Sequence, residues 1–231
     1  MRKGDERRQE ILTVAEKLFC AKGYEATSVQ DILDVLHASK GGFYHHFASK
    51  EEVLKTLCVQ RAGRAAQHTA DVLDGLSGEM KRINAVLHGF MPLRREEVPF
   101  VNMLLPMLDK PEGRALALVY QDALCEVFLP LLERETDDAA LTGVVCPPVR
   151  DMASVILHIV NRCWLDVAMY LIQATRQALR YDTAAMLGIL EKYRRAVEVL
   201  LDAPYGSVEI IRVEEWEEVA QRLMRTLQLG E

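Results

Sequence analysis

Side chains that can donate hydrogen bonds to a polyanion are concentrated between residues 27 and 50. This stretch offers hydroxyl, imidazole and ammonium groups on Thr27, Ser39, Lys40, Tyr44, His45, His46 and Lys50. Lysine and histidine can donate to phosphates or to base edges, and a tyrosine hydroxyl can donate to a phosphate. The residue types in this stretch therefore favour contact with nucleic acid.

Two adjacent glycines, Gly41 and Gly42, lie among these donors, inside a short predicted helix. Each glycine in a helix interior costs about 1 kcal/mol relative to alanine. A helix without a special partner would not be expected to contain two of them. A helix whose backbone must come close to DNA would require them.

Capping residues and apolar periodicity predict four helix starts within the first fifty residues. The first helix is predicted to end at Gly23, where a glycine stop belongs. The other starts are predicted from capping residues: a capping box of Thr27 with Gln30, an N-cap at Ser39, and a capping box of Ser49 with Glu52. A three-residue break, 37–39, separates the second helix from the third. This layout predicts a helix-turn-helix.

The third predicted helix should bury Phe43 and Phe47. Lys40, Tyr44 and His45 then point away from the apolar face, with His46 at its flank. Which of the two histidines reads bases is left open.

The other donors lie at predicted helix starts. A phosphate near the start of the fourth helix would meet both backbone N–H groups and the Lys50 ammonium. Thr27 could offer its hydroxyl in the same way at the second helix. Ser39 is predicted first as a cap, with phosphate contact as an added role.

Residues 27–54, TSVQDILDVLHASKGGFYHHFASKEEVL, closely resemble the DNA-binding signature of the TetR family. The preceding AEKLFCAKGYEATS fits the same family, and the resemblance covers about the first sixty residues. It implies phosphate contacts by Tyr44, His46 and Lys50, and positions nearest the base edges for Lys40, Gly41 and Gly42. It also implies a regulator, most often a repressor, that leaves a palindromic operator when a ligand binds.

The formal net charge of the 231 residues is -6, which by itself argues against nucleic-acid binding. The charge is unevenly distributed, however. Residues 1–68 carry a net charge of +2 and the remainder carries -8. This asymmetry favours an N-terminal end that binds a polyanion.

The five cysteines contain no CxxC pair, so neither a disulfide framework nor a zinc site is predicted. The charged start predicts no signal peptide. The most apolar stretch, 152–172, includes His158, Arg162 and Asp166, which disfavours a membrane span. The sequence therefore predicts a soluble cytoplasmic protein without metal, cofactor or membrane partner.

Beyond residue 71 the periodicity predicts longer helices near 77–94, 98–108, 112–135, 149–177 and 182–201, with a loop at 136–148 and a turn at 204–207. A final helix is predicted to carry Val213, Trp216, Ala220, Leu223 and Leu227. The predicted fold is all-α. A three-helix head (1–50) binds DNA, and a larger helical body (51–231) binds ligand and dimerises.

Two helices of the body are candidates for a dimer interface. The helix at 149–177 is apolar over most of its circumference, and the next one carries a seam of Met186, Leu190, Tyr193, Val197 and Leu200. Paired with their symmetry mates, the two helices would form a four-helix interface, which the family resemblance favours. The alternative is that both helices merely pack inside one monomer.

The candidate ligand-binding residues are Met103, Met107, Phe128, His158, Arg162 and Trp164. Further candidates for the same site are Phe90, Met91 and Tyr120. Pro106 and Pro130 are expected to break or kink their helices, and kinked, Met-rich helices can form an adaptable cavity. A mostly apolar molecule would suit it, with His158 or Arg162 holding one polar end. For each residue alone core packing is the alternative, and Arg162 can instead pair with Asp166.

Other classes of function remain as alternatives. An enzyme is disfavoured because no nucleophile elbow, P-loop, HExxH or dinucleotide fingerprint occurs. The acidic body argues against a protein that coats DNA nonspecifically. A thiol sensor based on Cys125 or Cys163 is disfavoured because apolar neighbours make thiols inert. In the favoured mechanism ligand moves the fourth helix, and with it the spacing of roughly 34 Å between the two recognition helices.

Overall fold

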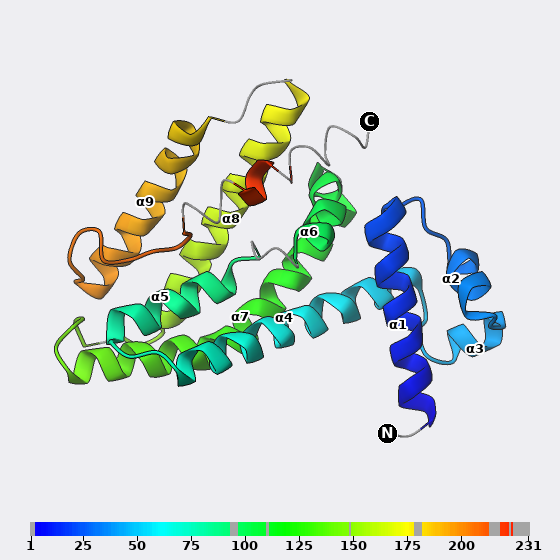
Figure 1. Ribbon diagram of the computed structural model, residues 1–231, viewed down its shortest axis with the longest axis horizontal. Coiled ribbons are helices and arrows are strands. Elements are labelled where there is room, and N and C mark those ends of the chain that lie inside the picture. Colours follow the sequence, from blue (N-terminus) through cyan, green and yellow to red (C-terminus); the bar gives the residue numbers. More distant parts are fainter. Residues whose placement is uncertain are drawn as a thin grey trace. The chain divides into compact units, whose positions relative to one another are not determined.

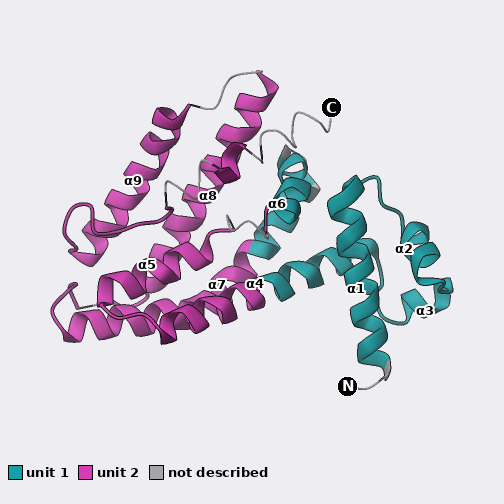
Figure 2. Cartoon of the chain, in the orientation of Figure 1, with its two compact units in different colours: residues 1–61, 99–120 teal, residues 62–98, 121–231 magenta. Residues whose placement is uncertain are grey.

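The computed structural model of the chain describes residues 3–92, 97–109, 111–147, 149–177, 182–212, 218–221 and 223. Throughout these residues the regular elements are helices, which confirms the predicted all-α fold. They form two compact units, residues 1–61 with 99–120 and residues 62–98 with 121–231 (Figures 1 and 2). The first unit extends beyond the predicted boundary at residue 50. The assignment of DNA binding and ligand binding to separate domains stays a prediction.

The N-terminal helices are α1 (Lys3–Lys22), α2 (Val29–Leu36) and α3 (Lys40–Tyr44). Gly23 ends α1 with a positive φ of 87°, as its position in the sequence predicted. His37 takes the left-handed conformation (φ 49°) directly after α2, and three residues separate α2 from α3. The predicted helix-turn-helix layout is confirmed.

One predicted cap of α2 is wrong. The N-cap is Ser28, whose hydroxyl accepts a hydrogen bond from Asp31 N at 3.1 Å, while the Asp31 carboxylate accepts one from Ser28 N at 2.6 Å. Thr27 is instead buried, and its hydroxyl donates to the Gly23 carbonyl at 2.8 Å. Moving the cap by one residue lets aspartate close the capping box in place of Gln30.

Helix α4 (Lys50–Asp74) begins as predicted, with Ser49 accepting from Glu52 N at 3.1 Å. The Glu52 carboxylate accepts from Ala48 N at 2.6 Å. The reciprocal bond of the predicted capping box therefore reaches one residue further back than expected.

The remaining elements follow the predicted periodicity closely. They are α5 (Glu79–Phe90), α6 (Val98–Leu104), the 3₁₀ helix η1 (Leu105–Asp109), α7 (Pro111–Leu141), α8 (Met152–Arg176) and α9 (Thr183–Leu201). The turn at 204–207 is present, with Ser207 N donating to the Pro204 carbonyl at 3.1 Å. Of the predicted final helix, residues 218–221 and 223 are helical. Val213, Trp216 and Leu227 lie outside the described residues.

One expectation about α7 is wrong. The helix runs to Leu141 through the first part of the predicted loop, and Pro130, which was expected to break or kink it, lies within it and does not end it. Glu135 and Thr136 are almost completely buried there, at 2% and 1% exposure. Thr136 donates to the Leu132 carbonyl at 2.9 Å, and Glu135 has partners outside the helix. These contacts stabilise a polar stretch whose composition is typical of a loop.

Arg82 of α5 holds three segments of the second unit together. Its guanidinium binds the Glu135 carboxylate through Nε at 2.6 Å and Nη2 at 3.0 Å. Its Nη1 donates to the carbonyls of Leu73 at 2.6 Å and Leu76 at 2.9 Å, at the C-terminal end of α4. Because the last carbonyls of a helix have no partner within the helix, this arginine caps α4 and ties it to α7.

By length and composition, two helical segments of the described chain could cross a membrane: Gly113–Leu141 and Met152–Arg176. The core helices of soluble proteins pass the same test, so this is weak evidence. His158 and Arg162 lie exposed on the second segment, where lipid would meet polar groups at high cost. The absence of a membrane partner stays a prediction.

Replacing Gly113 with alanine should destabilise the first unit. An added Cβ would lie 1.9 Å from the Met107 carbonyl oxygen and 2.4 Å from its carbon, so the backbone of η1 would have to move. Overpacking of this kind costs about 1–3 kcal/mol or more, and the melting temperature should fall by several degrees. Gly63→Ala in α4 is the control, because nothing lies within 4 Å of its Cβ position. Equal melting temperatures for the two variants would contradict the close contact.

Candidate nucleic-acid interface

Helix α3 presents one buried and one open face. Ser39 caps it, accepting from Gly42 N at 3.2 Å. Phe43 and Phe47 are both 1% exposed, which confirms that they face inward. The exposed positions of α3 and its C-cap are Lys40, Gly41, Gly42, Tyr44 and His45. An ammonium, a phenol hydroxyl and an imidazole thus reach solvent from a single short helix.

No close contact with the described residues requires a residue without a side chain at the two glycine positions of α3. A Cβ on Gly41 would meet only the Ser39 hydroxyl oxygen, at 4.0 Å, and a Cβ on Gly42 would meet the same atom at 3.5 Å. Neither glycine has a positive φ. Because alanine would fit beside the described residues and would favour the helix, we look for the reason for glycine outside these residues. Close approach of a partner to the α3 backbone supplies one.

His45 and His46 lie edge to face, with ring centroids 5.0 Å apart. His45 is exposed and His46 is half-buried. Both rings can reach solvent, so the choice between them as the base-reading residue stays open.

Thr27 does not present its hydroxyl at the surface as expected. The residue is 1% exposed, and its hydroxyl is bound to Gly23 inside the α1–α2 turn. Exposed Ser28 occupies the cap of α2 instead. Ser28 was not predicted as the cap, although serine three residues before aspartate is a capping-box pattern.

Lys50 has a structural role that its sequence position did not reveal. Its ammonium donates to the carbonyls of Tyr24 at 2.7 Å and Thr27 at 2.8 Å, and lies 4.1 Å from the centre of the Tyr24 ring. Partial burial lowers the pKa of Lys50. Lys50 therefore holds the α1–α2 turn against the start of α4. The expected phosphate contact stays a prediction, and one N–H of the ammonium is left for it.

Lys50→Met should lower the free energy of unfolding by about 1–3 kcal/mol, because two charge-assisted hydrogen bonds are lost. Lys55→Met on the same helix is the matched control. Lys55 forms an exposed pair with Glu51 at 2.7 Å, which contributes about 0.5 kcal/mol. Chemical denaturation measures both effects. A Lys50 variant as stable as the control would contradict the role of Lys50 in holding the turn.

Residues 11–57 match the family described as bacterial regulatory proteins, tetR family. The HTH-type transcriptional regulator YerO of Bacillus subtilis is 30% identical over 118 residues, which are 48% of this chain and 39% of YerO. The HTH-type transcriptional repressor KstR2 of Mycobacterium tuberculosis is 34% identical over 80 residues, which are 35% of this chain and 40% of KstR2. Residues 11–57 are therefore similar to the DNA-binding part of TetR-family regulators. The chain spans about two fifths of the length of these relatives.

Solved structures extend the likeness in fold to the whole helical chain. A TetR-family transcriptional regulator from Syntrophomonas wolfei superposes with a TM-score of 0.56 at 20% identity, covering 88% of this chain and 99% of that one. The reduced form of NemR from Escherichia coli gives a TM-score of 0.51 at 17% identity, covering 86% and 99%. At these identities the likeness concerns the fold alone. TetR-family regulators are not enzymes, which agrees with the lack of catalytic motifs in the sequence.

The candidate ligand residues are divided between the two units of the chain. Met103 and Met107 belong to the first unit and are each 6% exposed. In the second unit Phe128 is fully buried, with its ring edge to face against Phe90 at 5.6 Å. Trp164 is half-buried.

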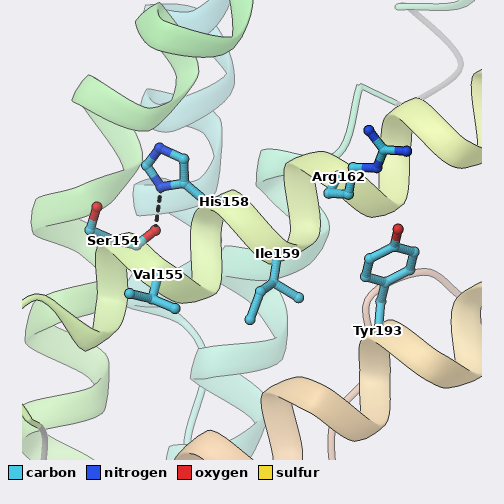
Figure 3. A pocket seen from close by; sticks show the side chains of 6 residues that line it. All are labelled: Ser154, Val155, His158, Ile159, Arg162 and Tyr193. Carbon is cyan, nitrogen blue, oxygen red and sulfur yellow. Dashed lines mark hydrogen bonds between the residues drawn. The ribbon is translucent and has the colours of Figure 1, made fainter.

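His158 and Arg162 lie instead on the exposed side of α8, in a groove of about 500 Å³ between α8 and α9 (Figure 3). The groove is lined by Ser154, Val155, His158, Ile159, Arg162 and Tyr193. Arg162 pairs with Asp166 at 2.9 Å, so the simpler of the two sequence interpretations is confirmed. Because His158 and Arg162 are both exposed, the structure does not support their predicted role at the polar end of a buried ligand cavity.

The apolar seam predicted on α9 is used within the chain. Met186, Leu190 and Val197 are at most 8% exposed in the single chain, and α9 packs against α8. The expectation that they face a partner is therefore wrong. The periodicity identified a buried face correctly but could not say which chain covers it.

The cysteines and acidic groups suggest no further chemistry. None of the five cysteines forms a disulfide, and burial raises the pKa of Cys58 and Cys163 to about 12. Burial also raises the pKa of Cys125. Within the described ranges no cluster of three or more potential metal ligands occurs.

Proposed function

We propose that the chain is a transcriptional repressor that binds a palindromic operator as a homodimer and releases it when a small molecule binds. The observation that carries the DNA-binding part is α3, where two glycines that the fold does not need lie among exposed donors. In a helix-turn-helix, this second helix enters the major groove. Since the target is DNA, we expect the protein to work in the cytoplasm.

Selection of DNA duplexes from a random library tests the proposal directly. Duplexes selected by the full chain should converge on a palindrome whose half-sites lie about 34 Å apart, or a multiple of it. Lys40→Ala and Tyr44→Phe should weaken binding to the selected duplex without unfolding the protein, because both side chains are exposed. Selection that yields no common sequence would overturn the proposal.

For the homodimer we propose the outward faces of α8 and α9. Each helix has apolar side chains that the chain itself leaves exposed: Val155, Met169, Leu187 and Val199 are between 37% and 62% exposed. Two-fold contacts use the same surface on both subunits, so a face made of two adjacent helices would give a four-helix interface.

For the effector we propose a small, mostly apolar molecule. The support is the buried aromatic pair of Phe90 and Phe128 in the second unit, with half-buried Trp164 of the same unit as a reporter. In a Trp216→Phe variant, emission then reports on Trp164 alone. A compound that changes this emission should also weaken operator binding, and DNA should weaken its binding by the same factor. A broad panel that changes neither property would overturn this part of the proposal.

A further inference from the structure

The outward face of α8 consists of residues spaced three, four and seven apart. Val155 and Met169 are 47% and 37% exposed, and the Arg162 side chain between them is 66% exposed. His158 is also exposed, whereas Ile159 and Leu165 are half-buried. Most residues on the opposite side of the helix are buried, although Trp164 there is half-buried, so the outward face is the larger exposed surface of α8.

The outward face has the same pattern in both directions from Arg162. Three residues away on either side lie Ile159 and Leu165, and seven residues away lie Val155 and Met169. Four residues away lie His158 on one side and Asp166 on the other. Apolar residues thus mirror apolar residues, and an imidazole mirrors a carboxylate.

Such a pattern is self-complementary for two antiparallel copies of one helix. In a two-fold contact, if residue i of one copy meets residue j of the other, then j also meets i. With the axis beside residue 162, residues at equal offsets on opposite sides of Arg162 face each other. Each apolar side chain then meets an apolar partner, and each imidazole meets a carboxylate.

We propose that two copies of this chain associate with their α8 helices antiparallel and the two-fold axis beside Arg162. This rests on the proposed homodimer and specifies its register. The groove in Figure 3 then receives side chains of the second copy, with Ile159 opposite Leu165 and Val155 opposite Met169. In this dimer the second copy fills the groove.

The charged side chains near the two-fold axis, Arg162 and Asp166, are compatible with this register. Each Arg162 is neutralised by its own Asp166 at 2.9 Å, so two arginines can approach each other. Asp166 also accepts from Tyr193 at 2.6 Å and Lys192 at 2.9 Å, which fixes the carboxylate between α8 and α9. A carboxylate has about four acceptor positions, so one is left for the facing His158.

His158 is oriented for such a contact. Its Nδ1 lies 2.7 Å from the Ser154 carbonyl oxygen, an acceptor, so Nδ1–H donates there. Nε2 is the nitrogen left to face the second copy, and because Nδ1 carries a proton, Nε2 donates to the carboxylate in the doubly protonated imidazolium form of the ring.

Disulfide trapping in the full chain tests the register. The background carries Cys20→Ser, Cys125→Ser and Cys146→Ser, and keeps the fully buried Cys58 and Cys163. Arg162→Cys, at the axis, should cross-link to its own copy under mild oxidation. Val155→Cys alone should not, because equivalent residues would lie about 21 Å apart along the antiparallel helices. Adding Met169→Cys to Val155→Cys should restore cross-linking.

The double variant keeps Arg162, so the test stands even if Arg162→Cys folds poorly. Sedimentation of the wild type separates the two levels of the proposal. A monomer at all concentrations would overturn the homodimer itself. A dimer in which Val155→Cys links to itself, or in which the Val155→Cys/Met169→Cys pair stays unlinked, would overturn the register alone.

Charge reversal at one position gives a second test. His158→Asp would place two carboxylates opposite each other and should raise the dimer dissociation constant about tenfold or more. His158→Arg places a permanent cation at the same position and should leave dimerisation close to wild type. Equal dissociation constants for the two variants would show that Asp166 of the second copy does not face this residue.

Discussion

Replacing Gly41 or Gly42 with alanine should make the protein more stable and its DNA complex weaker. Each substitution should add about 0.5–1 kcal/mol to the free energy of unfolding, because alanine favours the helix and its Cβ has room in the free protein. The same methyl group would stand between the α3 backbone and the groove of the operator. We expect a loss of affinity of about 10- to 100-fold per site, since each mismatched contact in such an interface costs about 1–3 kcal/mol.

Two measurements on the same samples check this prediction: thermal unfolding, and fluorescence anisotropy with a duplex selected by the wild type. Gly63→Ala is the matched control, because it replaces an equally open helical glycine outside α3. It should be stabilising to a similar degree without a change in affinity. If all three variants bind DNA like the wild type, the glycines of α3 serve some purpose other than close approach to DNA.

The N-terminal helices could be predicted from the sequence because the signals that start and end them are local. Ser39 caps α3 through a bond to Gly42, three residues away, and Gly23 ends α1 through its own φ. The inward face of α3 follows from the spacing of Phe43 and Phe47 alone. Interactions within one helical turn are visible in a sequence.

Features that depend on distant partners could not be predicted in this way. Lys50 binds carbonyls 26 and 23 residues before it, so its position suggested a phosphate contact and hid its role in the turn. Glu135 lies in a polar stretch that looks like a loop, and its partner Arg82 is 53 residues away. The pattern of α9 identified a buried face around Leu190, but periodicity is the same whether the same chain or a second copy covers that face.

Removing the Arg82 guanidinium should cause the largest loss of stability among these predictions. Arg82→Met keeps most of the apolar stem but leaves the Glu135 carboxylate, which is 1% exposed, with the more exposed Arg134 as its remaining partner among the described residues. It also removes the guanidinium bonds to the carbonyls of Leu73 and Leu76, although the Leu73 carbonyl still accepts from Leu76 N at 3.1 Å. Removing one partner of a buried ion pair costs about 3–5 kcal/mol, a large share of the stability of an ordinary domain.

The pair should also make stability depend on pH. Burial alone would raise the pKa of Glu135, but hydrogen bonds from Arg82 and Arg134 outweigh it and hold the pKa below its usual value. A lowered folded-state pKa stabilises the fold above the unfolded value of about 4.3, and this contribution is lost as the pH falls through the folded value. Denaturation at a series of pH values should therefore show a steeper loss of stability in acid for the wild type than for Arg82→Met.

A double variant separates the ion pair from the helix cap. Glu135→Leu removes the buried charge, so Arg82→Met/Glu135→Leu should be more stable than Arg82→Met alone, because no carboxylate is left uncompensated. The recovery should be incomplete, since the guanidinium bonds to the carbonyls of Leu73 and Leu76 are still missing. Full recovery to wild-type stability would mean that capping of α4 contributes nothing. A double variant no more stable than Arg82→Met would mean that Arg82 acts through the end of α4 and not through its charge.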